Sequence, residues 1–281
     1  MDKPAGLTSH DVVARVRRAL GTRSVGHTGT LDPFATGLLV VLVGRATRLA
    51  RYIERQEKTY DATARLGVAT TTDDLTGEPL PSERPPGSRV PPREEVEAAL
   101  SALQGASRQR PPVYSAKHVG GERSYARARR GDPVALADVD IVVRQVELLE
   151  YAYPDLRFRA TVSAGTYLRA LARDLGERLG SAAHLRALRR EAIGALSLSD
   201  AVALDEVDRG ALRPPLEVLG HLFRVEVSDA EAEQLAVGKA VALGAHGQGP
   251  VAATAPDGRL VAVGELRDGA FQPEVVLEAR A

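Results

Sequence analysis

One short segment places a single carboxylate in a defined turn. In the run from Gly26 to Gly37 (GHTGTLDPFATG), Asp32 precedes Pro33 and lies among small and hydroxyl-bearing residues. Proline fixes its own φ and disfavours the helical conformation for the preceding residue, so Asp32 is expected at a defined corner. A carboxylate held this way can act as a nucleophile. An Asp-Pro pair alone is more often a helix N-cap followed by proline, so the rest of the chain must decide.

Together with the run around Asp32, four further segments resemble the motifs of one enzyme family: Lys3–Ser9 (KPAGLTS), Lys58–Tyr60 (KTY), Ser163–Arg169 (SAGTYLR) and Leu185–Arg190 (LRALRR). Arg169 offers a counter-ion that would lower the pKa of Asp32 and keep the carboxylate charged and oriented. Taken alone, Arg169 is more typical of a solvated helix residue or an ordinary surface ion pair.

In this order, the segments resemble those of the bacterial tRNA pseudouridine synthases of the TruB family. The resemblance is strong from Lys3 to Arg190 and weak beyond Val225. It implies an enzyme that isomerises the uridine at position 55, in the T loop of tRNA, to pseudouridine. That reaction breaks an N–C glycosidic bond, turns the base and rejoins it through carbon. It needs no redox carrier and no metal, so we expect no cofactor.

The resemblance also implies catalytic roles for three residues. Asp32 matches the nucleophile, and Arg169 matches the arginine that pairs with it. Tyr60 matches the tyrosine that stacks on the flipped uracil and is a candidate base for the C2′ proton of the sugar. The target uridine must leave its stack to reach such a site. The resemblance leaves open whether the aspartate adds to C1′ or to C6.

Three more residues are implied to contact the substrate. Tyr167 matches a tyrosine that frames the base pocket, and Leu188 matches a leucine that closes the pocket over the base. His27 matches a histidine that inserts into the T loop in place of the uridine. On pattern alone, Tyr167 is a residue at the edge of the core, Leu188 a core residue and His27 a turn histidine. Because the chain has no cysteine and no histidine cluster near His27, we expect no metal site.

A basic segment is the strongest indication of a polyanionic partner. The net charge of the chain is zero, but seven basic residues and one acidic residue lie between Ala106 and Gly131. Arginine and lysine bind phosphate, and arginine also stacks on bases. This segment, with Pro111–Lys117 (PPVYSAK), resembles the bacterial insertion that closes over the T arm, although a mobile surface loop is the alternative. The predicted contacts to the RNA backbone are Arg108, Arg110, Lys117, Arg123, Arg127, Arg129 and Arg130.

Composition limits the protein class. The 281 residues are 44% hydrophobic and 26% charged, which is ordinary for a globular protein. No apolar run reaches eighteen residues and none lies near the N-terminus, so we expect neither a membrane span nor a secretory signal. We therefore expect a cytoplasmic protein. Nothing in the sequence demands more than a monomer.

The pattern of apolar residues predicts an α+β fold. We expect helices at 7–20, 94–103, after Gly165 and at 183–190, and strands at 38–43, 59–67, 141–149 and 156–162. The resemblance implies a mixed, largely antiparallel sheet with flanking helices. The proline-rich stretch 80–93 is expected to be a surface connection.

The last part of the chain changes character near Phe223. From Val225 onward there are four basic and nine acidic residues, and the pairs Asp257-Gly258 and Asp268-Gly269 predict hairpin turns. We expect a catalytic domain at 1–223 and a small β-rich domain at 224–281. The latter resembles the PUA-type RNA-binding domain in size and position, and its acidic balance suggests little phosphate affinity.

The sequence departs from the family pattern at two places. An apolar strand usually precedes the segment that begins at Lys3, whereas this chain begins with Met1-Asp2, so either the start lies upstream or that strand is missing. The family often has an acid at the position of Thr71, in 70–74 (TTTDD), while Asp74 is present. We expect the absence of an acid at position 71 to have a modest effect.

Other functions remain open at this point. A guide-RNA-dependent pseudouridine synthase shares the catalytic motifs, but the basic insertion favours the stand-alone form, so no guide RNA is expected. A non-catalytic tRNA-binding or tRNA-folding protein would not need Asp32, Tyr60 and Arg169 together. A phosphate-binding nucleotidase is a weak alternative, because the glycine-rich run lacks a Gly-Lys-Ser/Thr ending and a nearby acidic metal cluster.

Overall fold

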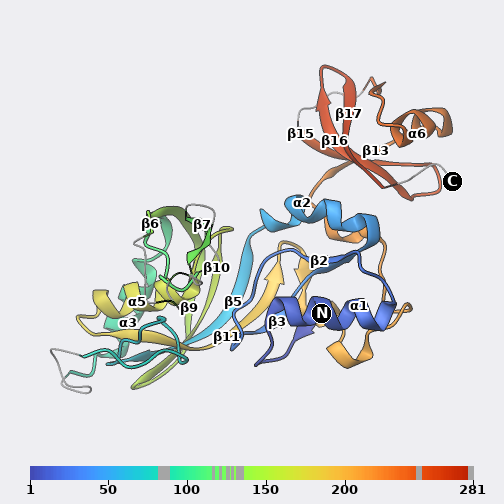
Figure 1. The fold of residues 1–281 in the computed structure, drawn as a ribbon. Helices are drawn as coiled ribbons and strands as arrows, with labels where there is room; N and C mark the ends of the chain where they lie inside the picture. Colours follow the sequence, from blue (N-terminus) through green and yellow to red (C-terminus); the bar gives the residue numbers. More distant parts are fainter. Residues whose placement is uncertain are drawn as a thin grey trace.

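The structure is a computed structural model that describes residues 1–81, 89–115, 118–119, 122–124, 127, 130, 136–244 and 249–277. These residues form two sheet-based parts, of which the C-terminal part lies beyond α2 (Figure 1). The larger part contains an eight-stranded sheet in the order β1-β3-β11-β5-β10-β9-β6, with β12 paired to β11. Only the β3–β11 pairing is parallel, so the predicted α+β class with a mixed, largely antiparallel sheet is confirmed.

The strands of the larger part have these bounds: β1 Asp2–Lys3, β2 Val25–His27, β3 Thr36–Leu38, β4 Val41–Val43, β5 Lys58–Leu66, β6 Gly105–Gln109, β7 His118–Val119, β8 Glu122–Arg123, β9 Val139–Ala152, β10 Asp155–Val162, β11 Ala183–Ile193 and β12 Leu196–Ser197. Its helices are α1 Ser9–Leu20, α2 Ala50–Glu54, α3 Arg93–Ser101 and α5 Leu168–Arg178. Short 3₁₀ turns follow at 44–49, 198–200, 204–206 and 215–219.

One face of the eight-stranded sheet packs against helices. Alternate residues of β5, including Tyr60 and Ala62, are buried on that face, while their neighbours are half-buried. The main core joins these residues to apolar side chains from α1, α3 and α5, such as Val13, Val96 and Leu171. The opposite face carries arginine–carboxylate pairs, as expected for a sheet with one side exposed to solvent.

Most predicted elements are found close to their expected positions. Helix α1 begins one residue after Thr8, whose side chain accepts a hydrogen bond from the Asp11 amide in a capping box. The predicted helix at 94–103 corresponds to α3, and the predicted helix after Gly165 corresponds to α5. The predicted proline-rich connection falls partly on residues 82–88, which lie outside the described residues.

Two predictions of secondary structure are wrong. Residues 183–190, predicted as a helix, belong to strand β11, which pairs with β5 from Ala183 to Ile193. Two register shifts, between Leu185 and Ala187 and between Arg190 and Ala192, interrupt the alternation that would have indicated a strand.

The apolar run 38–43 is not one strand. The chain leaves β3 after Leu38, and Leu39 and Val40 connect it to β4, which pairs with β2. Backbone bonds hold this connection, because the Leu39 amide donates to the Met1 carbonyl at 2.9 Å and the Thr28 amide donates to the Val40 carbonyl at 3.1 Å. A continuous apolar run is therefore split between two sheets.

The C-terminal part is a five-stranded sheet in the order β13-β15-β16-β17-β14, with one helix against it. Its elements are β13 Phe223–Glu226, α6 Asp229–Ala236, β14 Val241–Ala242, β15 Gly249–Thr254, β16 Leu260–Arg267 and β17 Ala270–Val276. The predicted hairpin turns at Asp257-Gly258 and Asp268-Gly269 connect β15 to β16 and β16 to β17. The helix α6 is an element that the sequence pattern did not indicate.

The two parts share a hydrophobic core. Leu38, Leu49 and Ile53 of the larger part form one buried cluster with Val263 and Val275 of the C-terminal sheet. Polar contacts surround this cluster at the end of β17. They are the hydrogen bonds from Arg45 Nη1 to the Leu277 carbonyl (3.2 Å), Arg48 Nη1 to the Val276 carbonyl (3.0 Å) and Tyr52 Oη to Glu274 Oε2 (2.8 Å), with an ion pair between Arg51 and Glu274.

None of the helices among the described residues combines the length and the apolar character that a membrane crossing needs.

We predict that Gly37→Ala destabilises the protein far more than Gly44→Ala. Both glycines have positive φ, +101° and +63°, which costs an alanine about 1–2 kcal/mol. A Cβ on Gly37 would also lie 2.3 Å from the Arg190 carbonyl oxygen, whereas a Cβ on Gly44 meets nothing within 4 Å. With about 1–3 kcal/mol added for overpacking, Gly37→Ala should cost about 3 kcal/mol of unfolding free energy. Urea unfolding of both variants measures the difference, and equal losses would contradict it.

Candidate active site

The segment before α1 supports the loop that carries Asp32. The Lys3 ammonium donates to the carbonyl oxygens of Leu7 (2.7 Å) and Pro33 (3.3 Å), and the Gly6 amide also donates to Pro33 at 2.8 Å. The Ser9 hydroxyl accepts a hydrogen bond from the Leu31 amide at 2.9 Å. Lys3–Ser9 therefore braces the loop that carries Asp32.

Asp32 and Arg169 lie in direct contact, as predicted. Arg169 is the second residue of α5, and its side chain is 6% exposed, against 32% for Asp32. Its Nε lies 2.9 Å from Asp32 Oδ2, and its Nη2 donates to Asp32 Oδ1 at 3.2 Å. The structure thus brings together two residues that are 137 positions apart in the sequence.

Arg169 also bridges Asp32 to a second carboxylate. Its Nη1 lies 3.6 Å from Oδ2 of Asp74, whose side chain is 6% exposed. Nη1 and Nη2 also donate hydrogen bonds to the backbone carbonyl oxygens of Thr72 and Tyr114, both at 2.9 Å. The guanidinium is therefore held by two backbone segments as well as by the carboxylates, which restricts its orientation relative to Asp32.

The threonine-rich loop around Asp74 fixes this second carboxylate. Asp74 Oδ1 accepts hydrogen bonds from the hydroxyls of Thr72 (2.7 Å) and Thr76 (2.6 Å) and from the Thr76 amide (2.9 Å). The neighbouring Asp73 pairs instead with Arg173 at 2.9 Å. No role was predicted for Asp74 from the sequence, although the hydroxyls at positions 72 and 76 were a visible signal of a fixed carboxylate.

Burial raises the pKa of Asp32 above its usual value. The charges of Arg169 and Lys3 act in the opposite direction, while Asp74 adds to the rise. The expected lowering of the Asp32 pKa by Arg169 is therefore present, but burial outweighs it. Arg169 therefore favours the charged form of Asp32 against the effect of burial.

The four other predicted site residues occupy different elements. Tyr60 is 6% exposed near the start of β5, and Leu188 is 8% exposed on β11. Tyr167 directly precedes α5, where Gln109 holds its backbone through bonds of 2.9 and 3.2 Å. Burial raises the pKa of Tyr167. His27 ends β2, which pairs with β4.

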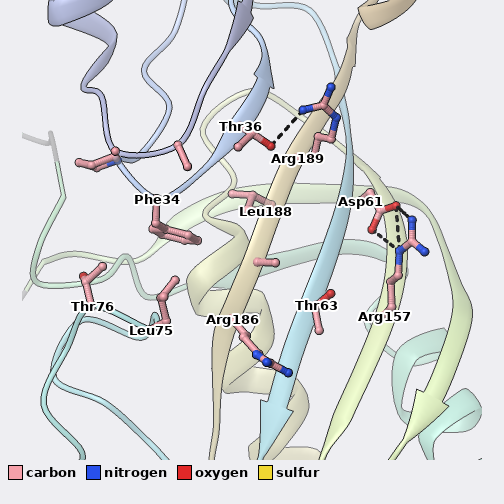
Figure 2. Close-up of a pocket in the computed structure, with 14 residues that line it drawn as sticks. Phe34, Thr36, Asp61, Thr63, Leu75, Thr76, Arg157, Arg186, Leu188 and Arg189 are labelled. Atoms are coloured by element: carbon pink, nitrogen blue, oxygen red, sulfur yellow. Dashed lines mark hydrogen bonds and ion pairs between the residues drawn. The ribbon is translucent and has the colours of Figure 1, made fainter.

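A groove of about 660 Å³ opens on the face of the sheet that does not carry the helices. Figure 2 shows Phe34 and Leu75 on one side of it, Leu188 on the β11 strand and Arg157 paired to Asp61 across from them. Pro33 lines this groove, but Asp32 and Tyr60 are not among its described lining residues. Leu188 therefore lies in the wall between the groove and the buried side of the sheet.

The structure describes part of the predicted basic segment. Arg108 is exposed on β6, and Arg110 lies 3.8 Å from Asp138 in an exposed ion pair. Arg127 is half-buried and Arg130 is exposed. Arg123 belongs to β8, and its side chain is not described. Lys117 and Arg129 lie outside the described residues.

In the described part of the chain, no three histidine, cysteine, aspartate or glutamate residues are grouped so that they could hold a metal ion.

Comparison with known proteins decides the family. The model of the N-terminal domain of the TruB family pseudouridylate synthases matches residues 17–168, and the model of the C-terminal domain of tRNA pseudouridine synthase II matches residues 223–278. The chain belongs to the TruB family. The first match contains Asp32 and Tyr60, and the second begins where the C-terminal sheet begins.

Bacterial members of the TruB family align along almost the whole chain. The tRNA pseudouridine synthase B of Thermobifida fusca is 48% identical over 98% of this chain and 96% of its own length. That of Leifsonia xyli is 46% identical over 95% and 91%, and that of a Synechococcus strain is 43% identical over 100% and 97%.

Solved structures share the fold. A chain from a Cbf5-Nop10-Gar1 complex is 26% identical and superposes with a TM-score of 0.73 over 99% of this chain and 84% of its own length. A chain from an H/ACA RNP bound to a substrate RNA that contains 2′-deoxyuridine superposes with a TM-score of 0.76, over 99% and 84%, at 24% identity. At that identity, the second likeness shows only the fold.

We predict that Arg169→Ala lowers the unfolding free energy by about 3 kcal/mol at pH 7, because it leaves the half-buried Asp32 and the buried Asp74 without their shared cation. Without the cation, the pKa of Asp32 in the folded protein, which burial already raises, rises further above its value in the unfolded chain. The loss should therefore shrink as the pH falls through that raised value and the Asp32 carboxyl takes up a proton. Urea unfolding at pH 7 and pH 5 measures both effects.

Arg159→Ala is the matched control for this prediction. Arg159 also bridges two carboxylates, Glu191 at 2.8 Å and Glu147 at 3.1 Å, but its side chain is 42% exposed. Exposed pairs contribute less than about 1 kcal/mol. Equal, pH-independent losses in both variants would show that the burial of Arg169 has no energetic consequence.

Proposed function

We propose that this TruB-family pseudouridine synthase converts the uridine at position 55, in the T loop of tRNA, to pseudouridine, with Asp32 as the nucleophile. The observation that carries the proposal is the contact between Asp32 and the buried Arg169 at 2.9 Å. Several relatives that cover nearly the whole chain are named for activity on tRNA. The resemblance of the run around Asp32 to the catalytic loop of that family supports the assignment to position 55.

The geometry supports a covalent route. Asp32 is partly exposed, so its carboxylate can reach a base that has left its stack, while Arg169 holds the attacking oxygen in one orientation. The N1–C1′ bond of the uridine breaks and a C5–C1′ bond forms. N1 then carries a proton, and the hydrogen on C5 leaves as a proton. Addition of Asp32 at C1′ or at C6 is compatible with this outcome.

Tyr60, Tyr167, Leu188 and His27 are proposed to hold the RNA at the site. Tyr60 would stack on the flipped uracil, Tyr167 would frame its pocket and Leu188 would close it. His27 would occupy the place that the uridine leaves. Two observations support these roles: Tyr60 and Leu188 lie on neighbouring paired strands, and Asp32 is among the charges that influence the pKa of Tyr167.

We propose the basic segment as the contact to the T arm, and a stand-alone monomer in the cytoplasm, where tRNA is found, without a guide RNA. The segment lies next to the site, because the carbonyl oxygens of Tyr114 and Arg110 accept hydrogen bonds from Arg169 and Arg173 of α5. We also propose a functional division into a catalytic domain at 1–223 and a PUA-like domain at 224–281.

Asp32→Asn tests the proposed chemistry. The change keeps the shape and removes the charge, so pseudouridine formation should fall by more than about 1,000-fold, as expected for loss of a nucleophile. Binding of unmodified tRNA should stay within about twofold. Mapping pseudouridine in the tRNA at nucleotide resolution checks both the activity and the position. Turnover by a clean Asp32→Asn preparation, or modification elsewhere than position 55, would overturn the assignment.

Replacing Arg127, Arg129 and Arg130 by alanine tests the proposed RNA contact. If all three contact phosphates, the slope of log affinity against log salt should fall in magnitude by about two to three. The control replaces Arg93, Arg209 and Arg213, three exposed arginines elsewhere, and should leave the slope unchanged. A slope that changes only in the control would place the RNA on another surface.

A further inference from the structure

Three buried cations surround the loop of Asp32. Lys3, Lys58 and Arg190 are 0%, 8% and 1% exposed. Among the described residues, none of them forms an ion pair within 4.0 Å, and all their hydrogen bonds there go to backbone carbonyl oxygens. A buried charge without a carboxylate partner is costly. Burial and the charge of Arg190 lower the pKa of both lysines to about 8.

Arg190 connects the segments before and after Asp32 in its loop. Its Nε donates to the Leu38 carbonyl at 2.7 Å, and its Nη2 donates to the Gly29 carbonyl at 3.1 Å. Gly29 lies three residues before Asp32, and Leu38 lies six residues after it. Because the guanidinium is planar and rigid, it fixes the distance between the two carbonyls. A neutral side chain of similar size would leave both acceptors without this donor.

Backbone pairing on both sides of Arg190 restricts the position of its side chain. Arg190 pairs in parallel with Gly37 on β3 and in antiparallel with Tyr60 on β5. A Cβ on Gly37 would lie 2.3 Å from the Arg190 carbonyl oxygen, so the two strands are in close contact. The Arg190 side chain therefore starts from a fixed backbone position beside Tyr60 and reaches the loop that carries Asp32.

We propose that Arg190 is a positioning residue, whose guanidinium clamps the Gly29 and Leu38 carbonyls and thereby holds the Asp32 carboxylate against Arg169. The inference rests on the proposed role of Asp32. Arg190 makes no contact with Asp32 that would assist it directly, so its effect passes through the backbone of the loop. Without the clamp, the loop would move, and a displacement of about 1 Å at a reacting group can cost about 100-fold in rate.

The variants that test this are Arg190→Met and Arg190→Lys. Arg190→Met removes both donors, so the single-turnover rate on unmodified tRNA should fall about 100-fold, while tRNA affinity stays within about twofold. Arg190→Lys keeps the charge and one point donor but not the fork, so its rate should lie between those of Arg190→Met and the unchanged protein. Arg159→Met, an exposed arginine of β10, is the control and should keep the full rate.

The pH dependence separates positioning from a general loss of structure. The charged groups around Asp32 are Arg169 of α5, Asp74 of the threonine-rich loop and Lys3 of β1. If the clamp holds Asp32 against Arg169, its loss weakens that contact and raises the Asp32 pKa. The acid limb of the pH–rate profile should then move to higher pH in Arg190→Met, and less so in Arg190→Lys. A general loss of stability would lower the rate without this shift.

The outcomes are distinguishable. Full rate and an unshifted acid limb in folded Arg190→Met overturn the inference. If Arg190→Met does not fold, Arg190→Lys decides, and a full rate with an unshifted limb in that variant overturns it too. An active Asp32→Asn would remove the proposed nucleophile itself, whereas an inactive Asp32→Asn with normal Arg190 variants removes only the clamp.

Discussion

The arrangement of the site depends on one buried guanidinium. Arg169 joins Asp32 of the first loop, Asp74 of the threonine-rich loop and the Tyr114 carbonyl that follows β6. These groups come from three separate parts of the chain, and α5 gives the arginine a rigid base. Because Asp32 and Asp74 share a single cation, Arg169 offsets the repulsion between the two carboxylates and ties both loops to α5. The same interaction therefore orders the loops and opposes the rise in the Asp32 pKa that burial causes.

The sequence predicted the contact between Asp32 and Arg169 better than the packing that holds it. The contact was predictable because both residues lie in segments that resemble family motifs, and the helix after Gly165 has a clear apolar stripe. The clamp by Arg190 was not predictable, because a guanidinium bound only to carbonyl oxygens leaves no complementary residue in the sequence. Asp74 lay within a recognisable run, but its contact with Arg169 depends on loop packing between distant segments.

The two wrong elements have a common physical origin. Strand β11 carries register shifts, so its buried residues do not alternate, and its many arginines gave residues 183–190 the composition of a polar helix. The apolar run 38–43 turns between two sheets because Leu39 and Val40 are held by backbone bonds to remote residues. In both places, pairing with distant strands decided the conformation, and local periodicity could not show it.

The buried cluster shared by the two parts gives the molecule a particular thermodynamic behaviour. Leu38, whose carbonyl binds Arg190, packs in the same cluster as Val263 and Val275 of the C-terminal sheet. The two parts are therefore coupled through this cluster, and the end of the loop that carries Asp32 packs at the contact between them. Loosening of the C-terminal sheet would remove apolar cover from that end, so a change far from the proposed base pocket can alter the shape of the loop that carries the proposed nucleophile.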